Sequence, residues 1–347
     1  MARTDVTVRG AGIFGLAIAW TCARRGAAVR VIDPGGPGAG ASGGLVGALA
    51  PHVPENWNEK KAFQFDSLIL AEAFWAEIEA TGGVSPGYAR TGRLQPVADA
   101  AALDLARARA RGTETLWQGK AAWRVCRAEE AGAFAPPSPT GWLIHDTLTA
   151  RLHPRRACAA LAAALRVRGV EIAAEGEDHG RVIHATGAAG LIALSQALGR
   201  PIGNGVKGQA ALLRFHADAQ APQIFAGGLH VVPHGDGTLA IGSTSERDYD
   251  DHAATDGLLE DLIDRARDAL PLLHGAPVIE RWAGLRPRAK SRAPMLGAHP
   301  LHEGQFIANG GFKIGFGMAP KVAEVMADLV LEGRDAIPEG FRPDASL

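Results

Sequence analysis

The fold is decided by one stretch near the amino terminus, Val6-Thr7-Val8-Arg9-Gly10-Ala11-Gly12-Ile13-Phe14-Gly15. Apolar and polar residues alternate from Val6 to Arg9, which predicts a short strand. The glycines that follow predict a tight turn and then a helix that runs to about Arg25 and stops at Gly26. A second strand is predicted over residues 28–32. The segment therefore predicts a strand, glycine turn, helix and strand, the opening unit of a nucleotide-binding sheet.

Each part of the glycine turn suits a different task in such a unit. Gly10 makes the turn, Gly12 lets a pyrophosphate approach the backbone, and Gly15 lets the helix pack against the strand. At Ile13 and Phe14 the helix begins, and its free N–H groups and positive dipole end favour phosphate. The alternative is an α/β domain whose glycines only allow close packing.

An acidic residue supports the nucleotide interpretation. Asp33 ends the second strand about 18 residues after Gly15, where a carboxylate accepts hydrogen bonds from ribose hydroxyls. The motif alone leaves NAD and FAD open. Asp33 leads into Ala41-Ser42-Gly43-Gly44 instead of further strand and helix units, and a second turn, His184-Ala185-Thr186-Gly187, comes some 150 residues later. This order favours FAD.

The remaining chain predicts a second, largely antiparallel sheet. Long amphipathic or apolar segments predict helices over residues 58–79, 100–111, 154–168, 258–270 and 320–331. Strands are predicted over residues 91–97, 181–187, 209–215, 230–233 and 238–242, and Gly-rich turns are expected in the last third of the chain.

Composition limits the class of protein. With 347 residues the chain is long enough for about two domains. A hydrophobic content of 47% and a charged content of 21% exclude intrinsic disorder. The net charge of -1 argues against nucleic acid as a partner, and any membrane association is expected to be peripheral. The three cysteines predict neither a disulfide framework nor a metal site, and without a leader segment or membrane span we expect a cytoplasmic protein.

Several motifs, in order along nearly the whole chain, resemble those of the FAD-dependent D-amino-acid oxidase (DAO) family, which includes glycine oxidase, sarcosine oxidase and D-amino-acid dehydrogenases. Besides Gly10 to Gly15, Asp33 and the Ala41 loop, they are Ala185-Thr186-Gly187, Val206-Lys207-Gly208-Gln209, His230-Val231-Val232-Pro233, Gly284-Leu285-Arg286-Pro287 and Asn309-Gly310-Gly311-Phe312-Lys313-Ile314-Gly315.

The resemblance implies an α/β fold with an α+β second domain. A Rossmann-like FAD-binding domain would comprise residues 1–80, 145–205 and 284–347, and a substrate-binding domain on an antiparallel sheet would comprise residues 81–144 and 206–283.

The resemblance also implies a substrate site. Arg286 would bind the substrate carboxylate, which suits a guanidinium because it stays charged and offers two parallel donors. A structural salt bridge is the alternative. His230 stands where the family commonly has Tyr, and Lys313 where glycine-oxidase-like members often have Arg, so both are candidates for substrate contact or for ordinary structural positions.

FAD would be held without a covalent bond, because no cysteine follows Cys158, and no metal is expected. The residues implied in FAD binding are Gly10, Gly12, Ile13, Phe14, Gly15, Asp33, Ala41, Ser42, Gly43, Gly47, Thr186, Gly187, Arg286, Gly310, Gly311, Phe312, Lys313 and Ile314.

The implied activity is oxidation of a small amino acid or secondary amine, such as glycine, sarcosine or a D-amino acid, to an imine by hydride transfer to flavin N5. Oxygen or a quinone would accept the electrons. Two alternatives stay open: a flavoprotein subunit that needs an electron-accepting partner, and a tRNA-modifying oxidase acting on a carboxymethylaminomethyl group, which the stretch Gly47-Ala48-Leu49-Ala50-Pro51 resembles.

Overall fold

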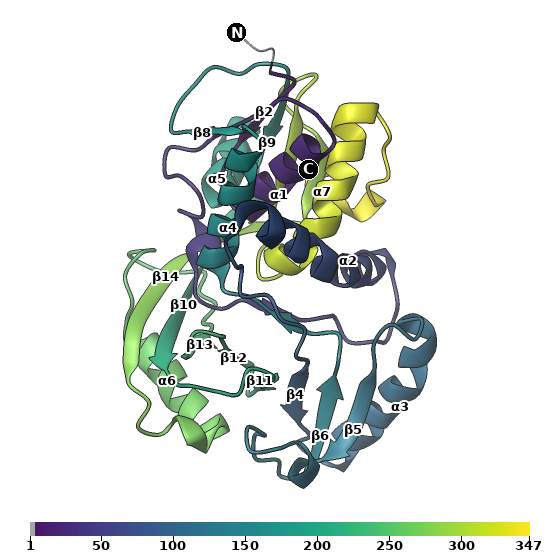
Figure 1. Cartoon of the computed structure of the whole chain (residues 1–347), viewed down its shortest axis with the longest axis vertical. Coiled ribbons are helices and arrows are strands. Elements are labelled where there is room, and N and C mark those ends of the chain that lie inside the picture. The colour runs from purple at the N-terminus through teal and green to yellow at the C-terminus, as the bar shows by residue number, and fades with distance from the viewer. Residues whose placement is uncertain (1–3) are drawn as a thin grey trace.

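Two large sheets organise the protein, as seen in a computed structural model that describes residues 4–347. The six-stranded sheet has the order β15-β16-β9-β1-β2-β8, and the eight-stranded sheet has the order β14-β10-β13-β12-β11-β4-β6-β5. Figure 1 shows the two sheets at opposite ends of the long axis, with the amino-terminal and carboxyl-terminal segments together at one end. The expected α/β class with a mainly antiparallel second sheet is confirmed.

The six-stranded sheet is parallel except at one edge. Its strands are β1 (Val6–Arg9), β2 (Val29–Ile32), β8 (Glu171–Ala173), β9 (Arg181–His184), β15 (Met295–Ala298) and β16 (Phe306–Asn309). β1 lies between β2 and β9, with Val8 opposite both Val31 and Ile183, and only β15 pairs antiparallel, with β16. Parallel neighbours place the carboxyl ends of β1, β2 and β9 at the same edge, where ligands of such sheets bind.

Helices pack on this sheet or on one another around it. They are α1 (Ile13–Arg24), α2 (Glu59–Gly82), α4 (Pro154–Val167), α5 (Gly187–Ala197) and α7 (Gly315–Glu332), and α5 also contacts the other sheet. α1 is apolar on all sides and buried from Ile13 to Ala23, as expected of a helix enclosed by other elements. Trp20 and Met318 lie in the same core with no exposed surface, so α1 and α7 pack together behind the glycine turn.

The second sheet is largely antiparallel and carries two helices, α3 (Ala100–Leu116) and α6 (Gly257–Ala269) (Figure 1). Its strands are β4 (Arg93–Pro96), β5 (Trp123–Arg127), β6 (Trp142–Asp146), β10 (Gly203–Arg214), β11 (Gln223–Ala226), β12 (Leu229–Pro233), β13 (Thr238–Gly242) and β14 (Val278–Ala289). A short pair, β3 (Ala48–Leu49) and β7 (Ala150–Arg151), forms a separate ladder.

The expectation of Gly-rich turns in the last third is wrong for its most important segment. Residues 278–289 form β14, one continuous strand along the whole of β10. Pro287 is compatible with this strand because β14 lies at the edge of the sheet, where a missing N–H breaks no ladder. Another difference is α7, which begins at Gly315 and passes through Pro320 instead of starting there.

The sequence-based division into domains stays a prediction. The two sheets correspond broadly to its two parts, and β14 runs across residue 284, where the division was drawn. None of the helices within residues 4–347 combines the length and apolar content needed to cross a membrane.

Candidate active site

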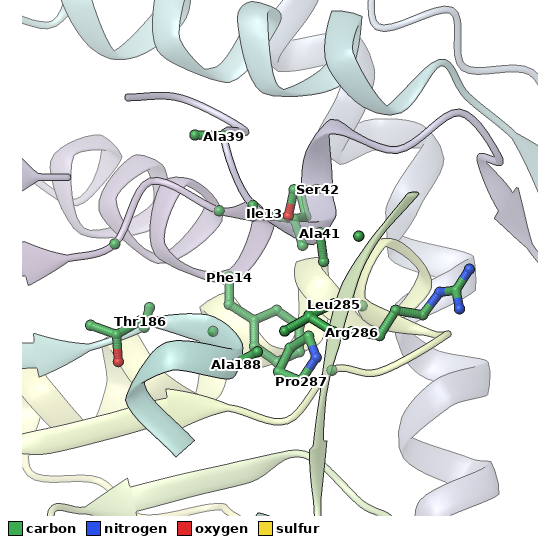
Figure 2. Close-up of a pocket in the computed structure, with 18 of the residues that line it drawn as sticks. Ile13, Phe14, Ala39, Ala41, Ser42, Thr186, Ala188, Leu285, Arg286 and Pro287 are labelled. Carbon is green, nitrogen blue, oxygen red and sulfur yellow. Dashed lines mark hydrogen bonds between the residues drawn. The ribbon is translucent and has the colours of Figure 1, made fainter. Parts of the chain in front are cut away.

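One cavity of about 870 Å³ extends from the glycine turn after β1 to β14 in the second sheet. Its wall comes from the turn after β1, the residues after β2, the turn between β9 and α5, β14, and the segment between β16 and α7. Figure 2 shows Ser42 and Ile13 at one part of this wall, Thr186 and Ala188 at another, and Leu285 to Pro287 crossing it. A cavity of this size accommodates an organic ligand.

The glycine turn has geometry that only glycine allows. Gly10 has φ +111°, and a Cβ there would lie 2.2 Å from the carbonyl oxygen of Ala185. A Cβ on Gly15 would lie 1.8 Å from the carbonyl oxygen of Gly10, which confirms that Gly15 lets α1 pack against the strand. A Cβ on Gly12 would meet only the Ser42 hydroxyl, at 3.3 Å, so the backbone at Gly12 is open to the cavity.

Two side chains hold this turn in place. Asp33 Oδ2 accepts a hydrogen bond from the Ala11 N–H at 2.7 Å, and Oδ1 accepts one from the Gly35 N–H at 2.9 Å. Ser42 Oγ accepts from the Ile13 N–H at 2.9 Å. The Ile13 N–H at the start of α1 is therefore already bonded to Ser42, and is not free for phosphate as the sequence suggested.

Residues 310–313, which precede α7, form the part of the cavity wall that lies next to β14 of the second sheet. Gly310 has φ +74°, and a Cβ on Gly311 would lie 2.9 Å from the Phe14 ring. The Phe312 N–H donates to the Pro287 carbonyl at 2.9 Å, which ties this segment to β14. Gly315 begins α7 and lines the cavity, so the positive dipole end of α7 faces the cavity.

Arg286 is the main charged group at the β14 end. It lies opposite Val206 of β10, and its guanidinium covers Gly208, where a Cβ would lie 1.6 Å from Nη1. Nη1 donates to the Thr244 carbonyl at 3.2 Å, and Arg286 forms no salt bridge within residues 4–347. Burial lowers its pKa to about 10, opposed by the charge of Glu246. The guanidinium stays charged at neutral pH, with most of its donors available.

Lys313 and His230 differ in how close they come to the cavity. Lys313 lines it, and burial together with the charge of Arg286 lowers the pKa of its ammonium. His230 lies on β12 against the Phe225 ring, 4.7 Å between centroids, and is absent from the cavity wall. Burial and the charges of Arg93 and Lys313 lower the pKa of His230 to about 3, so its ring is neutral.

The structure brings most of the candidate residues to one wall. Fourteen of them line the cavity: Gly10, Gly12, Ile13, Phe14, Asp33, Ala41, Ser42, Thr186, Gly187, Arg286, Gly310, Gly311, Phe312 and Lys313. Gly15, Gly43, Gly47, Ile314 and His230 are not in the wall. Gly47 instead packs on backbone, since a Cβ there would lie 1.8 Å from the Leu152 carbonyl oxygen.

The sequence analysis missed several lining residues, including Val46, Pro154, His252 and Trp282. Trp282 could have been found from the sequence. If residues 278–289 are recognised as a strand, Trp282 and Arg286 fall on the same face because side chains alternate along a strand. His252 has no such signal, since it lies in the irregular segment between β13 and α6.

The arrangement can hold a dinucleotide cofactor. Open backbone at Gly12 and at Gly187, where a Cβ would meet nothing within 4 Å, provides a place for a diphosphate. Asp33 retains acceptor capacity beside that backbone because a carboxylate has about four lone-pair sites. The far end offers a guanidinium and a helix dipole, so an anionic group can bind there.

Comparisons with known proteins agree with this geometry. The model of the DAO family, described as FAD dependent oxidoreductase, matches residues 5–329. Glycine oxidase from Pseudomonas putida is 28% identical over 377 aligned residues, which cover 99% of each chain. A putative thiamine biosynthesis oxidoreductase from Rhizobium etli is 31% identical, covering 94% of this chain and 96% of that protein.

Solved structures share the fold. Iminodiacetate oxidase from Chelativorans superimposes with a TM-score of 0.84 at 23% identity, covering 98% of this chain and 99% of that one. Glycine oxidase from Geobacillus kaustophilus gives a TM-score of 0.81 at 22% identity, covering 99% and 98%. With the family match spanning most of the chain, the sequence-based recognition is confirmed. The chain belongs to the DAO family of FAD-dependent oxidoreductases, and FAD is its cofactor.

Proposed function

We propose that the protein oxidises a small amine that carries a carboxylate, such as glycine, sarcosine or a D-amino acid, to the corresponding imine. One observation carries the proposal: Arg286 lines the cavity with one hydrogen bond to Thr244 and no carboxylate partner within the described chain. A largely buried guanidinium with free donors favours an anionic ligand, and a carboxylate matches its two-pronged geometry. The named activities of the relatives, glycine oxidase and iminodiacetate oxidase, support the same class of substrate.

The chain's own residues would divide the work between the two ends of the cavity. Gly10, Gly12, Asp33 and Gly187 would hold the nucleotide part of FAD, which when bound supplies the acceptor for the hydride of the substrate's α-carbon. Arg286 would anchor the carboxylate and orient that carbon.

Further charge around the substrate would come from two sources. Lys313 would add positive potential to the same end of the cavity, and the dipole of α7 would favour negative charge that develops beside Gly315. His230 would stay neutral and keep the shape of the neighbouring sheet. The imine product would leave as water hydrolyses it.

The experiment mixes the FAD-loaded protein, without oxygen, with glycine, sarcosine, D-alanine and L-alanine. We expect loss of the visible flavin absorbance with at least one amino acid, and a keto acid or aldehyde as product. No bleaching with any carboxylate-bearing amine would contradict the proposal. Re-oxidation by oxygen would indicate an oxidase, whereas re-oxidation only by an added quinone or dye would favour the subunit that needs an electron-accepting partner.

A further inference from the structure

Arg9 places a positive charge at the end of β1, directly before the glycine turn. Val6 and Val8 of the same strand are buried in the core around α1. Because side chains alternate along a strand, Thr7 and Arg9 face the opposite side of the sheet. Arg9 also lines the cavity, with 33% of its side chain exposed. The proposed function gives this charged group no task.

The connection between β8 and β9 lies against that side of the sheet. Thr7 Oγ1 donates to the His179 carbonyl at 2.7 Å and accepts from the His179 N–H at 3.0 Å. Arg9 Nε donates to Asp178 Oδ1 at 2.7 Å, and its Nη2 donates to the Gly176 carbonyl at 3.3 Å. Both polar side chains of β1 therefore hold the connection, and the connection in turn fixes the direction of the guanidinium.

This part of the cavity wall lies beyond the place for the diphosphate. It consists of Arg9, Asp33, Pro34, Ala174, Glu175 and Gly176. The Asp33 N–H donates to the Ala173 carbonyl at 2.9 Å, so Asp33 lies beside the start of the connection. In a nucleotide-binding sheet the diphosphate binds at the glycine turn and the acidic residue after the second strand binds the ribose. The wall beyond Asp33 is therefore where the base of the nucleotide, adenine in FAD, would lie.

The guanidinium of Arg9 has donors left for such a ligand. Of its five N–H groups, two are used within residues 4–347, by Asp178 and by the Gly176 carbonyl. A guanidinium is planar, so it stacks on aromatic rings and on nucleobases and can also donate to ring nitrogens. The pair with Asp178 is one-third exposed and adds little to folding stability, but it keeps the guanidinium beside the cavity.

We propose that Arg9 binds the adenine of FAD and that Asp178 positions the guanidinium for this contact. The connection between β8 and β9 completes the adenine site. This inference goes beyond the proposed function, because it concerns how the cofactor is held and does not depend on which amine is oxidised.

The test measures the dissociation constant of FAD by fluorescence titration of the apoprotein, with no amine present. Arg9→Met keeps an apolar stem and removes the planar charged group. We expect it to raise the constant about tenfold, as for loss of one stacking partner of a base. If Arg9→Met does not fold, Arg9→Lys replaces it, with a rise of at least about threefold because an ammonium has no planar face. An unchanged constant would overturn the inference.

Arg30→Met is the matched control. Arg30 lies on β2 against the same connection, since a Cβ on Gly176 would lie 2.9 Å from Arg30 Nη1, and it pairs with Glu171. It is not among the residues of the cavity wall. We expect the dissociation constant of FAD to stay within about twofold of wild type. If Arg30→Met weakens FAD binding as much as Arg9→Met does, Arg9 acts only by holding the connection, and the inference fails.

Asp178→Ala tests the positioning role. We expect it to raise the dissociation constant of FAD about threefold in the wild-type background and to have no further effect in the Arg9→Met background, because residues that act through one contact are not additive. The same rise in both backgrounds would show that Asp178 does not act through Arg9.

A crystal structure of the FAD-loaded wild type shows the contact itself. We expect the Arg9 guanidinium within about 4.5 Å of the adenine ring. An adenine bound away from Arg9 would overturn the inference. Failure of the protein to oxidise amines would instead contradict the proposed function, and it would leave the FAD dissociation constants unchanged.

Discussion

The two ends of the cavity are built in different ways. The glycine-turn end consists of backbone from one short stretch, Gly10 to Gly15, tightened by Asp33 and Ser42. The Arg286 end is assembled from β10, β14 and the segment after β13, which lie far apart in the sequence. The first end selects by shape and the absence of side chains, whereas the second selects by charge. Mutations at the glycine-turn end should therefore weaken FAD binding, whereas mutations at the Arg286 end should weaken substrate binding and turnover.

The largest effect is expected at the charged end. Arg286→Met should lower kcat/KM by roughly 30-fold to 5000-fold, because truncating one partner of a desolvated charged pair costs about 2–5 kcal/mol. FAD content should stay near wild type, since the nucleotide end is untouched. Steady-state kinetics and the ratio of visible to ultraviolet absorbance measure both quantities. Equal losses of FAD content and activity would contradict the assignment of substrate binding to one end and cofactor binding to the other.

At the glycine-turn end, Gly15→Ala should act on cofactor retention and stability. A Cβ 1.8 Å from the Gly10 carbonyl oxygen forces α1 away from β1, which costs about 1–3 kcal/mol or more. We expect protein purified largely without FAD and with a lower free energy of unfolding by urea. Gly112→Ala in α3 is the control, because its Cβ would meet only Leu116 Cδ1, at 4.0 Å. A Gly15→Ala protein with full FAD content would contradict the account of the turn.

A smaller effect is expected for Asp33→Asn. The amide can accept from only one of the two N–H groups of Ala11 and Gly35, and one lost hydrogen bond is worth about 1 kcal/mol. The dissociation constant for FAD should rise about fivefold, measured by fluorescence titration of the apoprotein, while the KM for the amine stays unchanged. Asp5→Asn, which also removes a carboxylate bonded to a backbone N–H, should leave FAD binding unaffected.

The smallest effect concerns His230 and acid stability. Its pKa is about 3 in the folded protein and near 6.5 when unfolded, so only the unfolded chain gains the proton as pH falls from about 6.5 towards 3. The stability associated with the neutral ring is present above pH 6.5 and declines through that window. Urea unfolding at pH 7, 5.5 and 4.5 should show a flatter decline for His230→Gln than for wild type. Parallel curves would mean that folding does not lower the pKa of the ring.

The nucleotide end could be predicted because its determinants are contiguous. The strand, the glycine turn, the helix and Asp33 are encoded within about 30 residues, and their period and spacing are visible in one segment. Even here the structure adds a contact that spacing does not show. Ser42 reaches the Ile13 N–H through the close approach of residues 41–43 to the start of α1, which depends on tertiary packing.

The charged end could be predicted only in part. Arg286 was identified by its motif, but residues 278–289 lay in the part of the chain where Gly-rich turns were expected. Pro287 disfavours a central strand, and β14 can contain it because β14 lies at the edge of the sheet. The placement of Gly208 beneath the Arg286 guanidinium depends on the register between β10 and β14, about 80 residues apart. The resemblance left His230 open between substrate contact and an ordinary structural position, and its position outside the cavity wall depends on how β12 packs against Phe225.

The most direct measurement is a crystal structure of the FAD-loaded protein with methoxyacetate, which has an ether oxygen in place of the amine of sarcosine and cannot be oxidised to an imine. The account predicts the FAD diphosphate over the backbone of Gly12 and the methoxyacetate carboxylate within about 3 Å of the Arg286 guanidinium. A carboxylate bound elsewhere, with Arg286 paired to a protein side chain, would contradict it.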